Sequence, residues 1–232
     1  EIGSCDWSSD VCSSDLLVIC GCTPKPTEVV SPDGHIRLQF ALDDHNRMTY
    51  RIDVDDTAFV APSALGFLAG KGVNLSEGMK VVGTEFSAAD ETWTQPWGEN
   101  KSIRNHYNEM AVCLSDEADT KLTLRFRVFD DGVGFRYEYE VAGVDSIFVT
   151  DELTSFNMAQ DGISWSIPAN YETYELLYRT QPLSKTDNAN TPMTFKVGKT
   201  YASIHEAALT DFPEMTLQNT GGCGFKIGRA HV

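Results

Sequence analysis

One stretch of the sequence gathers the side chains that usually recognise sugars. Residues 91–109 read ETWTQPWGENKSIRNHYNE and combine tryptophan, tyrosine and histidine with amides and carboxylates. A pyranose ring has an apolar face that stacks on an aromatic ring and a rim of hydroxyls that takes hydrogen bonds, so this composition favours sugar binding. The candidate substrate-binding residues are Trp97, Glu99, His106, Tyr107, Asn108 and Glu109.

The same residue types also have a structural interpretation. Tryptophan often fills a core, so Trp93 and Trp97 would pack inward and His106 would be a buried histidine whose hydrogen bonds are satisfied. Residue types alone favour this alternative. In both interpretations we expect residues 91–109 to lie between strands.

Two later stretches carry carboxylates that could bind a metal ion. Residues 164–179 place Glu172 and Glu175 among tyrosines, and residues 201–212 add further acidic side chains. Ca²⁺ takes six to eight oxygen ligands, and no local run of the sequence supplies them at a suitable spacing. The sequence therefore encodes no complete metal site.

No grouping of side chains indicates catalysis within the chain. The sequence contains no recognisable motif of a serine, histidine and aspartate triad, and Cys113 and Cys223 lack the spacing of zinc ligands. Cys113 lies between apolar neighbours, which favours a buried thiol, and a Cys113–Cys223 disulfide would be compatible with export. We therefore assign no catalytic residue.

The net charge argues against one class of partner. The 232 residues include 34 acidic and 18 basic side chains, which give a net charge of −16. This charge repels phosphate backbones, so we expect no nucleic-acid binding. No apolar run approaches the roughly 18 residues that a membrane-spanning helix requires.

Both ends of the chain resemble translated DNA adapters. Cys12 to Asp15 can be encoded by TGC TCT TCC GAT, and the reverse complement of that string encodes Ile-Gly-Arg-Ala, which occurs at Ile227 to Ala230. One DNA sequence read on both strands therefore accounts for both ends. We expect residues 1–16 and 227–232 to be artefacts that pack on nothing.

The residues after the first adapter-like segment predict export. Residues 17–28 read LVICGCTPKPTE, the end of an apolar signal followed by a polar tether that contains proline. Ile19 to Cys22 resembles a bacterial lipobox, which makes Cys22 a candidate lipid anchor. A short buried strand is the alternative. We expect an exported protein, in the periplasm or as an outer-membrane lipoprotein of a Gram-negative bacterium.

The elements that must position these residues are strands, because apolar and polar residues alternate through most of the chain. Residues 36–42 and 48–54 predict one hairpin, and residues 122–128 and 133–141 predict another. Residues 183–192 are polar and resemble a linker, and no amphipathic helix is indicated. The fold class is therefore all-β, a sandwich of antiparallel sheets. Shorter runs at 146–150, 163–167, 193–197 and 201–206 continue the pattern.

Five segments together resemble one enzyme family. They are SPDGHIRLQF, ETWTQPWGENKSIRNHYNE, RFRVFDDGVGFRYEYE, SWSIPANYETYE and IHEAALTDF. In order and approximate spacing they resemble the amino-terminal domain of glycoside hydrolase family 97, which includes bacterial α-glucosidases and α-galactosidases. We therefore expect residues 29–226 to form this domain, truncated at its end.

The resemblance implies a longer protein that contains a further domain. It implies a β-super-sandwich related to galactose mutarotase-like domains, packed against a (β/α)₈ catalytic barrel that acts on an α-linked oligosaccharide and carries the catalytic carboxylates. It also implies an active-site Ca²⁺ to which Glu175 contributes one ligand, although Glu172 replaces the aspartate expected beside it. On residue types alone, Glu175 is a solvated carboxylate at a strand edge.

Two alternatives compete with a non-catalytic domain of an exported α-glycosidase. A stand-alone sugar-binding module would be favoured if the natural gene ended shortly after Phe225. A mutarotase-like epimerase would need a histidine and a glutamate together in a cleft. The candidate pairs are His106 with Glu109 and His205 with Glu206. The second pair is unfavourable, because adjacent residues on a strand face opposite ways.

Overall fold

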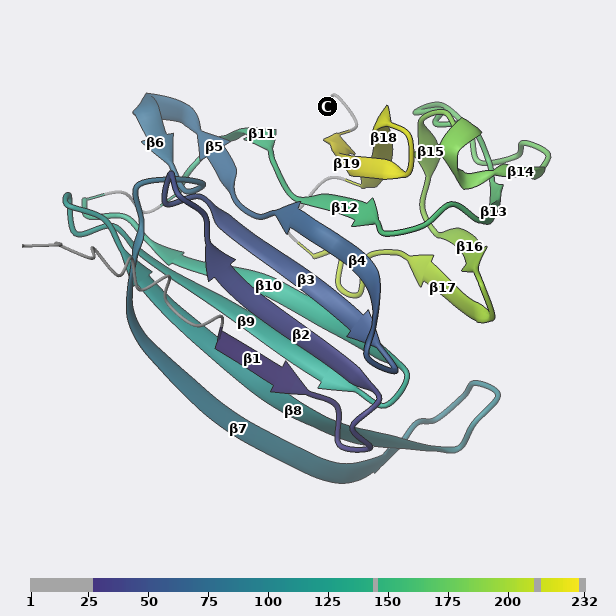
Figure 1. Ribbon diagram of the computed structural model, residues 1–232, viewed down its shortest axis with the longest axis horizontal. Coiled ribbons are helices and arrows are strands. Elements are labelled where there is room, and N and C mark those ends of the chain that lie inside the picture. Colours follow the sequence, from purple (N-terminus) through teal and green to yellow (C-terminus); the bar gives the residue numbers. More distant parts are fainter. Residues whose placement is uncertain (1–26, 144–145, 211–213, 230–232) are drawn as a thin grey trace, which may run out of the picture.

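Antiparallel strands make up most of the structure (Figure 1). The computed structural model describes residues 27–143, 146–210 and 214–229. Within these ranges the helical elements are two short 3₁₀ turns, η1 (Gly70–Gly72) and η2 (Leu183–Lys185). No helix in the described part of the chain is long and apolar enough to cross a membrane. The predicted all-β, antiparallel class is confirmed.

Eight strands form the largest sheet, in the order β1-β2-β3-β4-β12-β19-β18-β15. The predicted hairpin of residues 36–42 and 48–54 is present, with Ile36 opposite Val54 and Leu42 opposite Met48. The strands are β1 (Thr27–Val30), β2 (Ile36–Leu42), β3 (Met48–Val54), β4 (Thr57–Ala64), β12 (Ser155–Met158), β19 (Gly224–Arg229), β18 (Met215–Gly221) and β15 (Ala189–Asn190).

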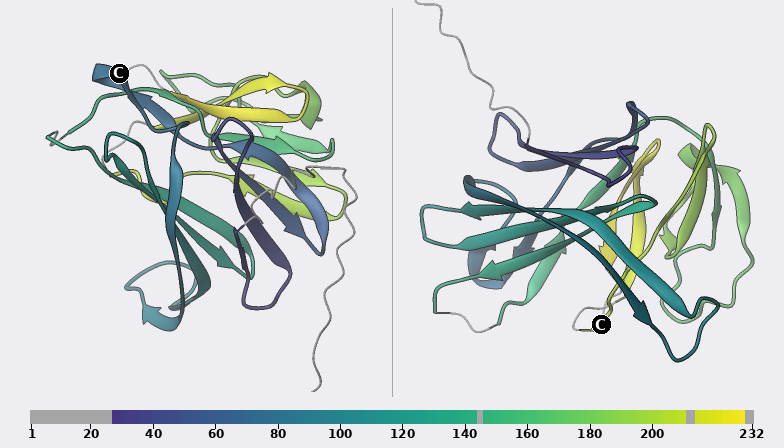
Figure 2. Two further views of the ribbon diagram at one scale, coloured as in Figure 1. Left: turned by 60° about the vertical axis from the view of Figure 1, so that its left-hand side comes forward. Right: turned by 90° about the horizontal axis from the view of Figure 1, so that it is seen from below.

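A sheet of four longer strands packs against the first one (Figures 1 and 2). We call it the long sheet, and its order is β10-β9-β8-β7. The second predicted hairpin is also present, with Val133 opposite Val128. The strands are β7 (Lys80–Thr94), β8 (Ser102–Ser115), β9 (Lys121–Phe129) and β10 (Gly132–Glu140).

Two smaller sheets complete the fold. One, in the order β11-β5-β6, joins β5 (Phe67–Ala69), β6 (Val73–Asn74) and β11 (Val149–Glu152). The other, which we call the side sheet, lies at the right of Figure 1 in the order β14-β13-β16-β17. Its strands are β13 (Ile163–Ser166), β14 (Arg179–Pro182), β16 (Met193–Val197) and β17 (Thr200–Ile204).

The main core lies between the eight-stranded sheet and the long sheet. Phe40 and Phe126 meet there with ring centroids 6.2 Å apart, and Tyr50 and Phe135 with centroids 5.6 Å apart. Alternate residues of each strand reach this layer because successive side chains of a strand point to opposite faces. Each large apolar side chain buried in this way contributes about 1.5–3 kcal/mol, which holds the two sheets together.

The two ends of the described chain differ from the adapter and tether predictions. Strand β1 begins at Thr27, inside the predicted tether. Ile227 pairs with Leu217 in β18, and its N–H donates to the carbonyl of Thr154 at 2.9 Å. The expectation that residues 227–232 pack on nothing is therefore wrong for 227–229, because β19 lies between β12 and β18 inside the sheet and Ile227 packs against the core. Residues 1–26 and 230–232, with Cys22, lie outside the described part.

Two smaller predictions are also corrected. The polar residues 183–192 are no linker, because Leu183 and Asn190 are fully buried and η2 and β15 lie within this range. The expected burial of Cys113 is wrong, because this residue is partly exposed. Cys113 and Cys223, whose pairing the sequence left open, are both free thiols.

Candidate functional site

The tryptophan-rich stretch forms a long hairpin. Strands β7 and β8 pair over most of residues 91–109, so the prediction of a stretch between strands is wrong except for the tip at residues 95–101. Trp93 is 64% exposed and Trp97 83% exposed, and the expected core packing of these two side chains is therefore also wrong. Trp97 and Glu99 lie at the exposed tip.

Two of the predicted sugar-binding residues are engaged on the outer face of the long sheet. Glu109 is buried, and its carboxylate accepts hydrogen bonds from Arg125 Nη1 at 2.7 Å and Arg127 Nε at 2.6 Å. Burial alone would raise the pKa of Glu109, but these hydrogen bonds outweigh burial and hold it below the ordinary value. Tyr107 packs beneath the Arg127 guanidinium, 4.4 Å from its ring centroid, and against Phe129.

The other two residues of the hairpin stem face the opposite way. Asn108 Nδ2 donates to the carbonyl of Val30 at 2.8 Å and so ties β8 to β1. His106 Nδ1 lies 3.5 Å from a carboxylate oxygen of Asp130, and this side chain is 27% exposed.

The six predicted sugar-binding residues therefore do not form one site. About 23 Å of strand separates the start of β8 from Glu109, at roughly 3.3 Å per residue. Trp97 and Glu99 are accessible. Tyr107 and Glu109 instead contact β9 within the long sheet, and Asn108 joins β8 to β1 of the other sheet. Sequence reasoning did not single out Arg125 and Arg127, whose alternation in RFRVF places both on one face.

The Glu175 segment, residues 170–178, leaves the side sheet between β13 and β14 and is fixed at its base. Asn170 Oδ1 accepts the N–H of Glu172 at 2.8 Å, and Asn190 Oδ1 accepts the N–H of Asn170 at 3.2 Å. Asn190 is fully buried, so it anchors the segment to the body of the domain. It is 20 residues from Asn170, and no local signal in the sequence indicates this role.

Beyond its base the Glu175 segment presents apolar side chains to solvent. Leu177 is 90% exposed, Tyr178 65% and Tyr171 56%. Glu175 is itself exposed, and its N–H donates to Thr173 Oγ1 at 3.0 Å. Within the described residues its carboxylate makes no ion pair. A carboxylate that is accessible in this way can ligate a cation held mainly by other groups.

The loop that follows β17 approaches the Glu175 segment. Burial, a hydrogen bond with Glu214 and the charge of Glu206 together raise the pKa of Tyr174. Burial and the charge of Glu214 raise the pKa of Glu206. The tyrosine in the middle of the segment therefore contacts acidic groups from outside it.

Neither histidine and glutamate pair considered for an epimerase is formed. His106 and Glu109 project from opposite faces of β8, because they are three residues apart on one strand. His205 Nδ1 interacts with the backbone carbonyl of Glu206, at 2.9 Å, and not with its carboxylate. The epimerase alternative thus has no acid–base pair in the described structure.

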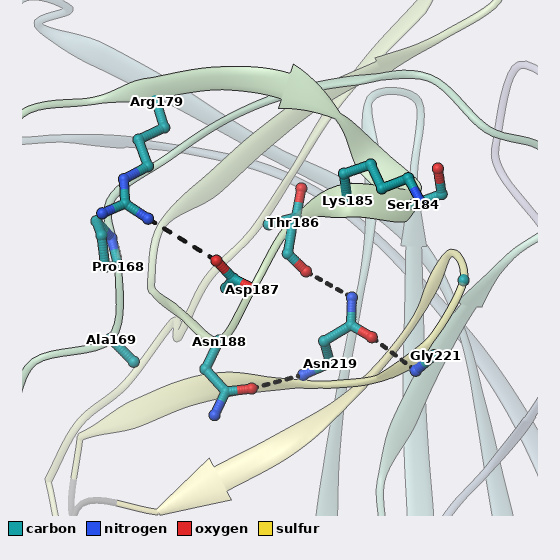
Figure 3. Close-up of a pocket in the computed structure, with 11 residues that line it drawn as sticks. Pro168, Ala169, Arg179, Ser184, Lys185, Thr186, Asp187, Asn188, Asn219 and Gly221 are labelled. Carbon is teal, nitrogen blue, oxygen red and sulfur yellow. Dashed lines mark hydrogen bonds and ion pairs between the residues drawn. The ribbon is translucent and has the colours of Figure 1, made fainter.

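A polar hollow of about 730 Å³ is lined by residues that flank the Glu175 segment on both sides in the sequence (Figure 3). Its polar groups bind one another: Arg179 faces Asp187 at 3.8 Å, and Asn219 Nδ2 donates to the carbonyl of Thr186. Pro168 and Ala169 line the same hollow, and none of its lining residues is aromatic. These contacts indicate that the hollow is a structural feature that holds the two ends of the Glu175 segment in place.

Across the described ranges, no three or more histidine, cysteine or acidic side chains converge to hold a metal ion. Glu175 alone cannot hold Ca²⁺, which takes six to eight oxygen ligands. The residues present therefore fit the implied metal only as a single ligand to an ion whose remaining ligands come from elsewhere.

A family model described as "Glycosyl-hydrolase 97 N-terminal" matches residues 29–230. The chain belongs to this family. A curated relative in Streptomyces bingchenggensis (strain BCW-1), named "Probable retaining alpha-galactosidase", is 26% identical over 165 residues, which cover 70% of this chain and 25% of that protein.

Solved glycoside hydrolase family 97 structures have the same fold. An enzyme from Pseudoalteromonas sp. strain K8, solved in complex with acarbose, is 32% identical with a TM-score of 0.81 over 88% of this chain and 32% of that one. A variant of the enzyme in complex with panose aligns equally well. A β-arabinopyranosidase, at 20% identity and a TM-score of 0.80, shows the fold alone; the match covers 87% of this chain and 35% of that one. The chain thus spans about a quarter to a third of these proteins.

Proposed function

We propose that the chain is the non-catalytic amino-terminal domain of an exported α-glycosidase and that it meets the catalytic domain through the Glu175 segment. The observation that carries this proposal is the exposure of Tyr171, Leu177 and Tyr178 on a segment whose base is fixed. Clustered exposed apolar side chains are typical of surfaces that bind another protein. Because hydrogen bonds already hold the base in place, the segment loses little conformational entropy when it docks.

The substrate class rests on the relatives. One is named a probable retaining α-galactosidase, and another binds panose and acarbose. We therefore propose an α-linked oligosaccharide as the substrate of the longer protein. The carboxylates that cleave the glycosidic bond would lie on the catalytic barrel, so we expect the 232-residue chain alone to hydrolyse no α-glycoside.

Glu175 would contribute one ligand to Ca²⁺ across the interface with the catalytic domain. Most ligands of the ion would come from the catalytic (β/α)₈ barrel. The bound ion would supply positive charge beside the substrate. This chain's own part would be to place the Glu175 carboxylate, through Asn170 and Asn190, at the active-site mouth. In Figure 1 the tip of the β7–β8 hairpin lies on the same side of the molecule as the side sheet. Trp97 and Glu99 of this tip would contact sugar at the rim.

A comparison of two neighbouring glutamates tests the role of Glu175. In a longer homologue that carries the YETYE segment, Glu175→Gln should weaken Ca²⁺ binding and lower kcat/KM more than Glu172→Gln, because only the first carboxylate would ligate the ion. Calorimetric Ca²⁺ titration and steady-state kinetics measure both effects. Equal effects, or a larger effect of Glu172→Gln, would show that Glu175 is a surface carboxylate.

A further inference from the structure

The outer face of the side sheet is an aromatic surface separate from the Glu175 segment. Alternation points Phe195 and Ser164 toward the core, where both are buried. The residues that alternate with these inward positions along each strand face outward. The outward positions are Ile163, Trp165, Thr180, Pro182, Thr194, Lys196, Tyr201 and Ser203.

Two aromatic rings form the centre of this face. Trp165 and Tyr201, from β13 and β17, lie with ring centroids 6.0 Å apart and planes inclined by 18°. Tyr201 is 63% exposed, and Ile163, two residues before Trp165 on β13, is 41% exposed. Two nearly parallel rings on the outer face of a sheet offer an aromatic surface, which suits the apolar face of a pyranose.

Hydrogen-bonding groups surround the two rings. Lys196 Nζ lies 4.9 Å from the centroid of the Tyr201 ring, and Thr194 Oγ1 donates to Ser203 Oγ at 3.4 Å. The ammonium lies over the Tyr201 ring, and this ammonium together with the two hydroxyls can bind the hydroxyl rim of a sugar.

The charge of the face distinguishes a neutral ligand from an ionic one. The chain has 34 acidic residues, yet none of the eight outward positions carries a carboxylate, and Lys196 is the single charged group among them. A cation would find no counter-charge there, and one ammonium beside a net charge of −16 attracts anions weakly. A neutral polyhydroxyl ligand is the class that fits.

We infer that Trp165, Lys196 and Tyr201 form an accessory pyranose-binding surface that holds one sugar unit of an α-glucoside or α-galactoside away from the Glu175 segment. The ring of Tyr201 stacks on the apolar face of the sugar. Lys196 donates hydrogen bonds to the sugar's hydroxyls, and Ser203 Oγ, which donates to the carbonyl of Met193 at 3.4 Å, accepts one from a sugar hydroxyl. An open surface of two rings gives weak binding, with a Kd on the order of 1 mM, which is about −4 kcal/mol. The inference does not depend on Glu175 or Ca²⁺.

NMR titration of the 232-residue chain tests this surface. Panose is the α-glucoside probe and raffinose the α-galactoside probe. We expect saturable shifts of the Trp165 indole N–H with at least one trisaccharide, and Tyr201→Ala should weaken the binding about three- to ten-fold, because aromatic contacts of this kind are worth about 0.5–1.5 kcal/mol. Tyr201→Phe keeps the ring and should bind within about two-fold of the original chain.

The controls distinguish sugar binding on the side sheet from sugar binding at the hairpin tip and from self-association. Phe148→Ala, which removes a 79% exposed ring outside both the side sheet and the hairpin tip, should leave the binding unchanged, and the unfolding midpoint of each variant checks its folding. Absence of saturation with both sugars overturns the inference. So does binding that Tyr201→Ala leaves intact and Trp97→Ala abolishes. Self-association that Tyr201→Ala abolishes, without any sugar binding, would overturn it too and identify the face as a contact between copies of the chain.

Discussion

Two regions of this domain have similar residue types but opposite roles. The stem of the β7–β8 hairpin contains HYNE, and the Glu175 segment contains YETYE. Glu109 of the stem is buried between Arg125 and Arg127, whereas Glu175 is exposed and fixed only through its backbone. In both regions a carboxylate lies near tyrosines in the sequence. It is buried and structural where arginines of a neighbouring strand bind it, as for Glu109, and it stays accessible where no strand lies beside it, as for Glu175.

Strand register explains the difference. Glu109 lies directly opposite Arg127 in the β8–β9 pair, and directly paired residues have Cβ atoms about 4.5–5.5 Å apart. Arg125, two residues along β9, reaches the same carboxylate and also Glu138 of β10. The Glu175 segment lies outside the named strands, so no register provides it with a partner.

Among the changes of carboxylates, the largest expected effect comes from removing the charge of Glu109. Glu109→Gln leaves two arginines without their shared counter-charge and should lower the free energy of unfolding by about 2–3 kcal/mol. This is at or below the low end for fully buried pairs, because the side chain of Arg127 is 40% exposed and can reach water. Urea unfolding measures it.

Glu85→Gln is the matched control for Glu109→Gln. Glu85 is an exposed carboxylate on the same face, paired with Ala111 in register, and its change should stay within about 0.5 kcal/mol. Equal losses for the two variants would remove the distinction between a buried and an exposed carboxylate on this sheet.

A smaller effect should appear as pH dependence. Hydrogen bonds from Arg125, and then from Arg136, outweigh burial and lower the pKa of Glu138 from 4.5 to about 2. A lowered folded-state pKa adds stability above the unfolded value of 4.5, and that stability is lost as the pH falls toward 2. Glu138→Gln should therefore flatten the pH dependence of the unfolding free energy in this range.

The expected loss for Glu138 is below that for Glu109, because 36% of its side chain is exposed and solvent screens the pair. Glu140→Gln is the control, since Glu140 forms only an exposed pair with Lys121. A curve for Glu138→Gln as steep as that of the original chain would show that other carboxylates cause the acid sensitivity.

The smallest effect is expected in the Glu175 segment. Leu177→Ala should change the unfolding free energy by no more than about 0.5 kcal/mol, because its side chain is 90% exposed. Leu124→Ala, in the core, should cost about 2–5 kcal/mol. A loss above about 1 kcal/mol for Leu177→Ala would mean that the segment packs on the domain, and the comparison of the two regions would fail.

The fold was more predictable than the site. Period-two alternation predicted the β2–β3 and β9–β10 hairpins, because local pattern and local pairing coincide there. The β7–β8 hairpin was missed at residues 91–109, where exposed residues on both faces hide the alternation. Residues 183–192 were misread as a linker because buried polar groups such as Asn190 find partners far along the chain.

By itself the sequence determined the all-β class and the resemblance to glycoside hydrolase family 97, because alternation and motifs are local properties. The choice of Glu175 as a ligand followed from that resemblance and stays a prediction. Only the tertiary structure decided which polar side chains are available to a ligand. Glu109, Tyr107 and Asn108 are engaged by partners on β9 and β1, up to 78 residues away. Availability depends on which strands lie side by side, and that is a property of the assembled sheets.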